Sequence, residues 1–249
     1  MISLSVPSNG GVSAVLAHRA RGVEDHDPLR AFLRSLDYFP TQPWAARAMA
    51  ELVMRVDPSA RSAWESACGE GIMAHGMSDY FDRLVMSDIH DYGVGGHVVD
   101  FLEPDLEPPG GPVDWIFTNP PFDNAKAFVT LALKRARRGV AMFVRLGFQE
   151  TIGRYELFSG PMAATLACPF AERVGIMLGD CKIGGGTAMA YMVVLWVVDP
   201  VLAEDYPGET LLRPIPPGTR DRLSRPSDGP FLAELRRTRR ARLLPGVTS

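Results

Sequence analysis

The chain has 249 residues, a net charge of −3 and 46% hydrophobic residues, which is typical of a globular protein. This length suits one large domain, or one domain with an appendage. No apolar run approaches the roughly 18 residues that a membrane span needs. The start of the chain lacks the charged-then-apolar pattern of a signal peptide. We therefore expect a soluble protein without a membrane partner.

The cysteine content is low and irregular. Cys68, Cys168 and Cys181 are odd in number and widely spaced. This pattern predicts neither a disulfide framework nor a zinc site, and we expect no metal. A reducing, cytoplasmic location is the simplest setting for such a chain.

The first part of the chain carries few structural signals. Residues 1–27 show little helical periodicity, and residues 28–37 are expected to form a short helix. We treat residues 1–37 as an N-terminal arm. A longer helix is expected to begin at Thr41, with Pro43 in its first turn, where proline is tolerated.

Strands and helices are then expected to alternate as far as residue 199. The expected strands cover residues 60–66, 84–87, 98–100, 113–118, 140–145, 173–177 and 189–198. The expected helices after the one at Thr41 cover residues 71–81, 123–137 (with Asp123 as the N-cap) and 152–158. This alternation predicts an α/β domain over residues 38–199, with a mainly parallel, doubly wound sheet.

The composition changes after residue 199, and residues 200–249 form a Pro/Arg-rich basic extension. Its prolines are expected to break regular elements up to a final helix that begins at Pro230 and ends near Leu244. Residues 213–249 contain nine arginines and three acidic residues, a net charge of +6, which leaves −9 for the rest of the chain. Such a run indicates either a solvated face or a contact with a polyanion.

The most informative motif is Asn119-Pro120-Pro121-Phe122, which directly follows the apolar run 113–118. The prolines fix their own backbone and favour extended geometry before them, so Asn119 is expected at the carboxyl end of a strand. The Asn119 side-chain oxygen and the Pro120 carbonyl are both acceptors and can together hold the two hydrogens of an NH2 group. The ring of Phe122 can stack on a planar base. The alternative is an ordinary strand-ending turn with an exposed aromatic residue.

A second motif is the glycine-containing segment 64–71, which follows a predicted strand and opens a helix. Its glycines allow the backbone to approach a ligand closely. The full Gly-x-Gly-x-x-Gly fingerprint of dinucleotide sites is absent, because position 74 is Ala. Glu65 and Glu70 would repel a pyrophosphate and would suit a cationic ligand, such as S-adenosylmethionine.

Two acidic residues follow the next predicted strands. Asp88 ends one of them, where a carboxylate can accept both ribose hydroxyls of a nucleoside. Asp100 ends the following strand and can accept from an adenine amino group, while Phe101 packs on the ring. Each acid alone could be a helix cap or a loop charge, but their order at successive strand ends favours a nucleoside site.

The order of these motifs, with Phe39-Pro40-Thr41 before them, resembles class I S-adenosylmethionine-dependent amino-methyltransferases over about residues 38–198. Within that class the chain looks like compact phage and prophage enzymes that methylate adenine N6 in DNA. The resemblance implies a Rossmann-like fold with a mainly parallel seven-stranded sheet and helices on both faces. It also implies S-adenosylmethionine as cofactor, S-adenosylhomocysteine as product and DNA as partner.

The resemblance further implies a role for each matched residue. Thr41 would hold the methionine carboxylate of the cofactor, Asp88 its ribose, and Asp100 with Phe101 its adenine. The residues that would line the methionine and sulfonium region are Glu65, Ala67, Gly69 and Gly71. The residues that would hold the target amino group and base are Asn119, Pro120, Pro121 and Phe122. A second aromatic residue against the flipped base would be Tyr191, with Phe148 as second choice. Phosphate contacts would come from the basic tail, at Arg236, Arg237, Arg239 and Arg240.

Other functions fit the same motifs. The Asn-Pro-Pro-Phe motif is specific for methylation of an NH2 group but not for the substrate. Some RNA methyltransferases, acting on adenine N6 or guanine N2, and some protein glutamine-N5 methyltransferases share it. A non-catalytic nucleic-acid-binding module is the alternative from another class. The core lacks a long recognition region, so specificity would be relaxed or supplied by a partner. Residues 179–187 would form either a mobile loop over the substrate or a plain hairpin connection.

Overall fold

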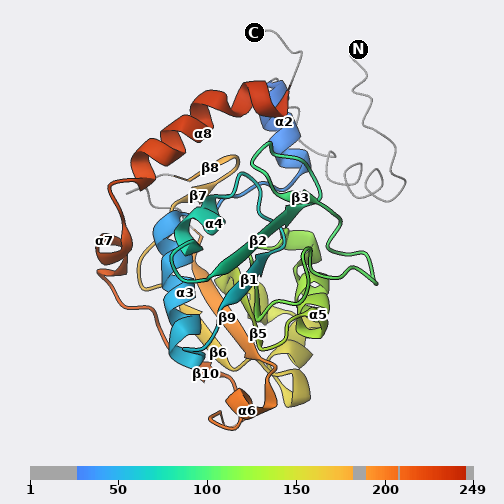
Figure 1. Cartoon of the computed structure of the whole chain (residues 1–249). Coiled ribbons are helices and arrows are strands. Elements are labelled where there is room, and N and C mark those ends of the chain that lie inside the picture. The colour runs from blue at the N-terminus through green and yellow to red at the C-terminus, as the bar shows by residue number, and fades with distance from the viewer. Residues whose placement is uncertain (1–26, 182–188, 207, 245–249) are drawn as a thin grey trace.

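The computed structural model describes residues 27–181, 189–206 and 208–244. Its centre is an eight-stranded sheet with the order β10-β6-β9-β5-β4-β1-β2-β3 (Figure 1). The strands are β1 (Ser62–Glu65), β2 (Arg83–Asp88), β3 (His97–Val98), β4 (Trp115–Thr118), β5 (Gly139–Arg145), β6 (Leu166–Pro169), β9 (Tyr191–Val197) and β10 (Leu211–Leu212). A separate antiparallel hairpin pairs β7 (Ile176–Met177) with β8 (Asp180–Cys181).

The sheet is mainly parallel, as the alternation of elements predicted. β1 pairs in parallel with β2 and β4, and the same orientation joins β2 to β3, β4 to β5 and β6 to β10. Only β9 runs against its neighbours β5 and β6. The carboxyl ends of β1, β2 and β4 therefore meet at one edge of the sheet.

Helices cover both faces of the sheet (Figure 1). The α-helices are α2 (Pro28–Ser35), α3 (Pro43–Val56), α4 (Ile72–Met77), α5 (Ala125–Arg135), α6 (Pro200–Ala203), α7 (Thr219–Leu223) and α8 (Asp228–Leu243). Short 3-10 helices are η1 (Phe122–Asn124), η2 (Leu146–Glu150), η3 (Ile152–Leu157) and η4 (Gly160–Met162). No helix within these described stretches is long and apolar enough to cross a membrane.

Alternation along the central strands divides the core into two layers. In β4, Trp115 and Phe117 pack in the layer that contains α3, while Ile116 packs in the layer that contains α5. Successive side chains of a strand point to opposite faces, so one four-residue strand joins both layers. Figure 1 shows α3 and α5 on opposite sides of the sheet.

Several expected elements differ from the structure. The sheet has eight strands instead of the expected seven. Six of the expected strands are in it, together with β6 and β10, which were not expected. The seventh expected strand, residues 173–177, contributes only β7 of the separate hairpin. The helix expected over 71–81 ends at Met77. Asp123 does not cap α5: it lies inside η1, and α5 follows Asn124 without a side-chain cap. Residues 152–157 form a 3-10 helix instead of an α-helix.

The segment after residue 199 is more regular than its prolines suggested. Pro200 is the first residue of α6, where a missing N–H costs nothing, and the Asp199 carboxylate accepts from the backbone of Val201 at 2.9 Å. α8 begins at Asp228, two residues before the expected start at Pro230. The predicted loop 179–187 is seen only in part, since residues 182–188 lie outside the described residues.

Candidate functional site

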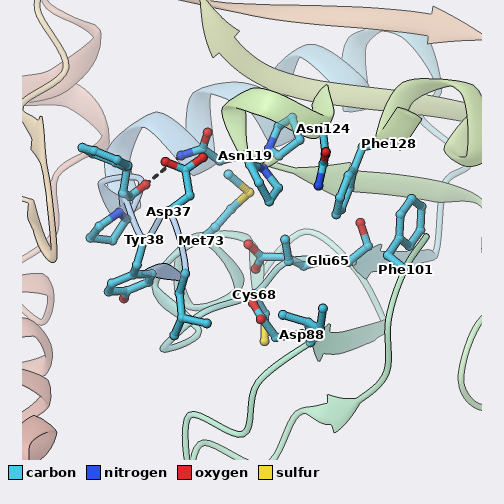
Figure 2. Close-up of a pocket in the computed structure, with 18 of the residues that line it drawn as sticks. Asp37, Tyr38, Glu65, Cys68, Met73, Asp88, Phe101, Asn119, Asn124 and Phe128 are labelled. Carbon is cyan, nitrogen blue, oxygen red and sulfur yellow. Dashed lines mark hydrogen bonds between the residues drawn. The ribbon is translucent and has the colours of Figure 1, made fainter. Parts of the chain in front are cut away.

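A cavity of about 970 Å³, including its open mouth, lies at the carboxyl ends of β1, β2 and β4. Its walls come from the loops that follow these strands and from the connection between α2 and α3 (Figure 2). Ten of the predicted site residues line it: Thr41, Glu65, Ala67, Asp88, Asp100, Phe101, Asn119, Pro120, Pro121 and Phe122.

The Asn119 amide is oriented by its neighbours. Its Nδ2 donates to the Phe39 carbonyl at 2.8 Å and to Thr41 Oγ1 at 3.1 Å. Because a carbonyl can only accept, Nδ2 must be the atom that faces Phe39. The other end of the amide, Oδ1, makes no hydrogen bond within the described residues and remains available as an acceptor beside the cavity.

The Asn-Pro-Pro-Phe loop is also fixed by Asp37, which sequence reasoning did not single out. The Asp37 carboxylate accepts from the backbone N–H of Phe122 at 2.7 Å. Asp37 has a φ of +53°, in the left-handed region that few non-glycine residues adopt. No motif in the sequence predicts this contact, because Asp37 and Phe122 are 85 residues apart along the chain.

Phe122 is held between two planar groups. The Phe39 ring lies 5.1 Å away at 47°, and the Arg145 guanidinium lies 3.6 Å from the centre of the ring. Arg145 is the last residue of β5, and its guanidinium makes a cation–π contact with the Phe122 ring. A base can therefore stack on this face of Phe122 only where Arg145 moves aside.

Glu65 supplies a buried carboxyl group to the cavity wall. Its side chain is 2% exposed, and its Oε2 has no hydrogen-bond partner among the described residues. Burial, followed by repulsion from Asp88, raises the pKa of Glu65 well above its ordinary value. A buried carboxylate in this state is suited to a cationic ligand, which would lower its pKa again. This observation fits the amino and sulfonium groups of S-adenosylmethionine.

Asp88 lies across the cavity from Asn119, at the end of β2 (Figure 2). Its carboxylate accepts from the backbone N–H groups of Gly69 at 2.8 Å and His90 at 3.2 Å. Burial raises the pKa of Asp88 to about 6, although these hydrogen bonds act in the opposite direction. The residue thus ties the glycine-containing loop to β2 and faces the ligand space.

Gly69 and Gly71 shape the loop without lining the cavity. Gly69 has a φ of +52°, and a Cβ there would lie 2.4 Å from the ring of Tyr38. Gly71 has a φ of +74° and is the N-cap of α4. Both therefore act through backbone geometry that other residues adopt only with strain.

The expected adenine-binding pair occupies the far wall. The Asp100 carboxylate accepts from the backbone of Leu102 at 2.8 Å, so it closes its own turn. Phe101 is largely in the core, stacked on Phe128 at 4.8 Å and edge-on to Trp64. Figure 2 shows Phe101 and Phe128 side by side on this wall.

A second cavity of about 1000 Å³ adjoins the first, and Pro120 and Phe122 line both. The second cavity also contains Phe148, whose ring carries the Arg154 guanidinium at 4.5 Å. Tyr191 does not line it. Tyr191 is 3% exposed and stacks on Phe143, in the layer of the core that faces α3. Of the two aromatic residues predicted to face the base, Phe148, the second choice, lines this cavity and Tyr191, the first choice, does not.

The four predicted phosphate contacts on α8 are not equivalent. Arg239 is buried at 8% exposure and pairs with Glu70, so it is not available to a polyanion. Glu70, expected near the ligand cation, does not line the cavity. Arg236, Arg237 and Arg240 are at least partly exposed. They pair with Asp180, Glu234 and Asp27 at 2.8, 2.6 and 3.6 Å.

No protein-family model and no curated protein matches the chain. Solved structures do match it. PH1948 of Pyrococcus horikoshii, a candidate RNA methyltransferase, superposes with a TM-score of 0.52 at 14% identity, over 76% of this chain and 96% of that protein. The methyltransferase subunit of a type I restriction-modification system from Streptococcus thermophilus gives 0.46 at 11% identity, over 70% of this chain. This chain spans 50% of that subunit.

The S-adenosylmethionine complex of the O-methyltransferase TomG from Streptomyces achromogenes gives a TM-score of 0.45 at 18% identity. The match covers 74% of this chain and 96% of TomG. The similarity to PH1948 establishes the fold class: the chain has the Rossmann-like α/β fold of methyltransferases. The expected fold is thereby confirmed, with an eighth strand at the β6 edge.

Proposed function

We propose that this chain is an S-adenosylmethionine-dependent N-methyltransferase that modifies the N6 amino group of adenine in DNA. One observation carries the proposal. The Asn119 amide is fixed with its oxygen free, next to Pro120, in the loop that separates two cavities. A pair of acceptors at such a junction suits an NH2 group that enters from one cavity and reacts toward the other.

The first cavity is proposed to hold the cofactor. Glu65 offers a buried carboxyl group, whose Oε2 has no partner among the described residues, to its cationic groups. Asp88 offers acceptors to the ribose, and Phe101 offers an apolar wall to the adenine. Thr41 lies beside Asn119 and would hold the methionine carboxylate. When bound, S-adenosylmethionine supplies an electrophilic methyl group.

The chain's own residues then act on the target amino group. Asn119 Oδ1 and the Pro120 carbonyl accept its two hydrogens and draw the nitrogen toward tetrahedral geometry. They also stabilise the positive charge that develops on this nitrogen during attack, which is a transition-state effect. Holding the nitrogen in one orientation contributes further. A proton leaves to water afterwards.

The second cavity is proposed to hold the target base. A base inside a duplex cannot reach Asn119 and must flip out, which costs a few kcal/mol that stacking and hydrogen bonds recover. Phe122 and Phe148 provide aromatic surface there. Arg236, Arg237 and Arg240 of α8 remain as proposed phosphate contacts.

The test uses methyl-labelled S-adenosylmethionine with unmethylated DNA, total RNA and cell protein in parallel, followed by digestion of each product. We expect the label in N6-methyladenine from DNA. Label only in RNA, or only in glutamine, would overturn the substrate and keep the chemistry.

Asn119→Ala tests the residue that carries the proposal. We expect a loss of kcat of about 10²- to 10³-fold, the usual effect of removing one transition-state hydrogen bond. Binding of S-adenosylhomocysteine, measured by calorimetry, should change much less than kcat, because Asn119 Oδ1 is assigned to the target amino group even though the side chain also lines the first cavity. Near-full activity of this variant would refute the assignment.

A further inference from the structure

Two arginines of the C-terminal helix converge on the glycine-containing loop. Arg239 Nε donates to Glu70 Oε2 at 2.8 Å, and Arg242 Nη2 donates to Glu70 Oε1. Glu70 is 1% exposed. It stands between Gly69 and Gly71, whose left-handed backbones set the shape of the loop. α8 thus contacts this loop from outside the cavity.

The same contacts extend to the wall of the first cavity. The Tyr38 hydroxyl donates to Glu70 Oε2 at 3.0 Å, and Arg242 Nη1 donates to the Tyr92 carbonyl at 2.6 Å. Tyr38 and Tyr92 both line the cavity, and their rings lie 5.2 Å apart. The Tyr38 ring also covers Gly69. Glu70 therefore connects α8 to Tyr38, while Arg242 connects the same helix directly to Tyr92, and both tyrosines line the cavity.

Stability alone is a weak reason for this arrangement. The attraction within a buried ion pair offsets little more than the cost of removing both charges from water, so apolar residues at these positions would attach the helix equally well. α8 already has another buried attachment. At its start, Asp228 accepts from both Nη atoms of Arg47 in α3, at 2.7 and 2.8 Å. Neither Arg47 nor Asp228 lines the cavity.

We propose that Arg239 and Arg242 are positioning residues for the cofactor, acting through Glu70 on the loop 67–71 and on Tyr38. This inference rests on the proposed function. Without Arg239, the Glu70 carboxylate loses much of its compensation and gains solvent by opening the loop. The backbone N–H of Gly69 then leaves Asp88, and the cavity wall loses its shape.

The experiment compares Arg239→Gln with Asp228→Asn, which disrupts the other buried ion pair of the same helix. Arg242→Gln serves as a second, less buried variant. Binding of S-adenosylhomocysteine is measured by calorimetry, and hydrogen exchange is measured on peptides that cover residues 66–72. Thermal denaturation reports the stability of each variant.

We expect Arg239→Gln to weaken S-adenosylhomocysteine binding at least tenfold and to increase exchange in the loop, with Arg242→Gln changing both in the same direction. Asp228→Asn should lower the thermal midpoint while binding stays within about twofold of wild type. Equal binding by wild type and both arginine variants would overturn the inference and leave the proposed function intact. Weakening by Asp228→Asn in proportion to its instability would also overturn it. Absence of binding to the wild type would overturn the proposed function, and the inference with it.

Discussion

Asp88 is a proposed ligand-binding residue whose pKa is also shifted by burial. Burial raises its pKa to about 6, while Glu65, Cys68 and Tyr92 contribute nearby titratable groups whose pKa values are also raised by burial. The folded state therefore holds the Asp88 proton more tightly than the unfolded chain does. Without ligand, this shift lowers the free energy of unfolding as the pH rises from about 4 to 6.

Ligand binding is expected to show the opposite pH dependence. Ribose hydroxyls donate to a carboxylate, so S-adenosylhomocysteine should favour ionised Asp88. For one group with a pKa of about 6, the dissociation constant at pH 5 should be about tenfold larger than at pH 7. Calorimetry across this range measures the effect. Asp88→Asn should bind weakly throughout and lose the step near pH 6, and a step retained by this variant would assign the titration to another group.

Arg145 occupies the face of Phe122 that a flipped base is proposed to use. Breaking this cation–π contact costs about 1 kcal/mol at a partly exposed site. We therefore expect Arg145→Ala to lower the KM for nucleic acid about fivefold, with little change in kcat. Steady-state methylation kinetics test this.

Arg154→Ala is the matched control for Arg145, because it removes the same type of contact from Phe148 in the same cavity. It removes one positive charge and uncovers Phe148 instead of Phe122, so the KM should fall less than in Arg145→Ala if Phe122 is the ring on which the base mainly stacks. A higher KM in Arg145→Ala would show that Arg145 contributes to binding and does not compete with the base.

At the residue scale, ten of the twelve residues predicted to hold the cofactor and the target amino group line the cavity, but the orientation of the side chains was not predicted. Strand ends place Asp88 and Asn119 at one edge of a parallel sheet, and this follows from topology. Asp37, Arg145 and Tyr38 come from segments distant in sequence, and their contacts depend on tertiary packing. Tyr191 shows the limit most clearly, because the two faces of a β-strand cannot be told apart from the sequence where apolar, buried residues occupy both of them, as in the first six residues of β9.

At the scale of elements, the glycine-containing loop depends on both its backbone and its neighbours. We expect Gly69→Ala to destabilise the protein by about 2–4 kcal/mol, since it combines a left-handed backbone with overpacking against Tyr38. S-adenosylhomocysteine binding should weaken as well. Urea denaturation and calorimetry measure these effects.

Gly229→Ala provides the control for that substitution. Gly229 lies in α8 without a positive φ, and a Cβ there would meet no atom within 4 Å. Alanine is the better helix former, so this variant should be as stable as wild type or slightly more so. Similar stability of the Gly69 and Gly229 variants would contradict the role given to the loop.

The elements that the sequence did not predict are short. β6 has four residues and ends in proline, and β10 has two. Neither is long enough to show the period of a strand, and pairing with β9 and β6 determines them. The long elements β5, β9, α3 and α8 were close to their expected ranges, because sustained apolar patterns extend over them.

At the scale of the whole molecule, α8 presents two different faces. Leu232, Leu235, Arg239 and Leu243 are buried at helical spacing. Arg239, predicted as a phosphate contact, therefore shares the face of the apolar positions, which their helical spacing could have indicated. Arg236, Arg237 and Arg240 lie off this face. The division of the chain into an arm, a domain at 38–199 and an extension stays a prediction, but α8 contacts the glycine-containing loop of that domain through Glu70.

The outer face of α8 leads to a prediction about salt. If Arg236, Arg237 and Arg240 each neutralise one phosphate, the slope of log K for duplex DNA against log salt should include about −2.7 from this helix. Affinity should then fall about 40-fold from this source between 50 and 200 mM salt. The variant with all three arginines changed to Gln should lose this part of the slope, because no counterions are released at these positions. Binding titrations at several salt concentrations measure this change in slope, with the thermal midpoint as the folding control.

The acidic partners of these arginines reduce the expected slope. Since each arginine already pairs with an acid, phosphates must replace Asp180, Glu234 and Asp27, which makes the true slope shallower than about −2.7. An unchanged slope in the triple variant would place the DNA on another surface and leave α8 only its contacts with the glycine-containing loop.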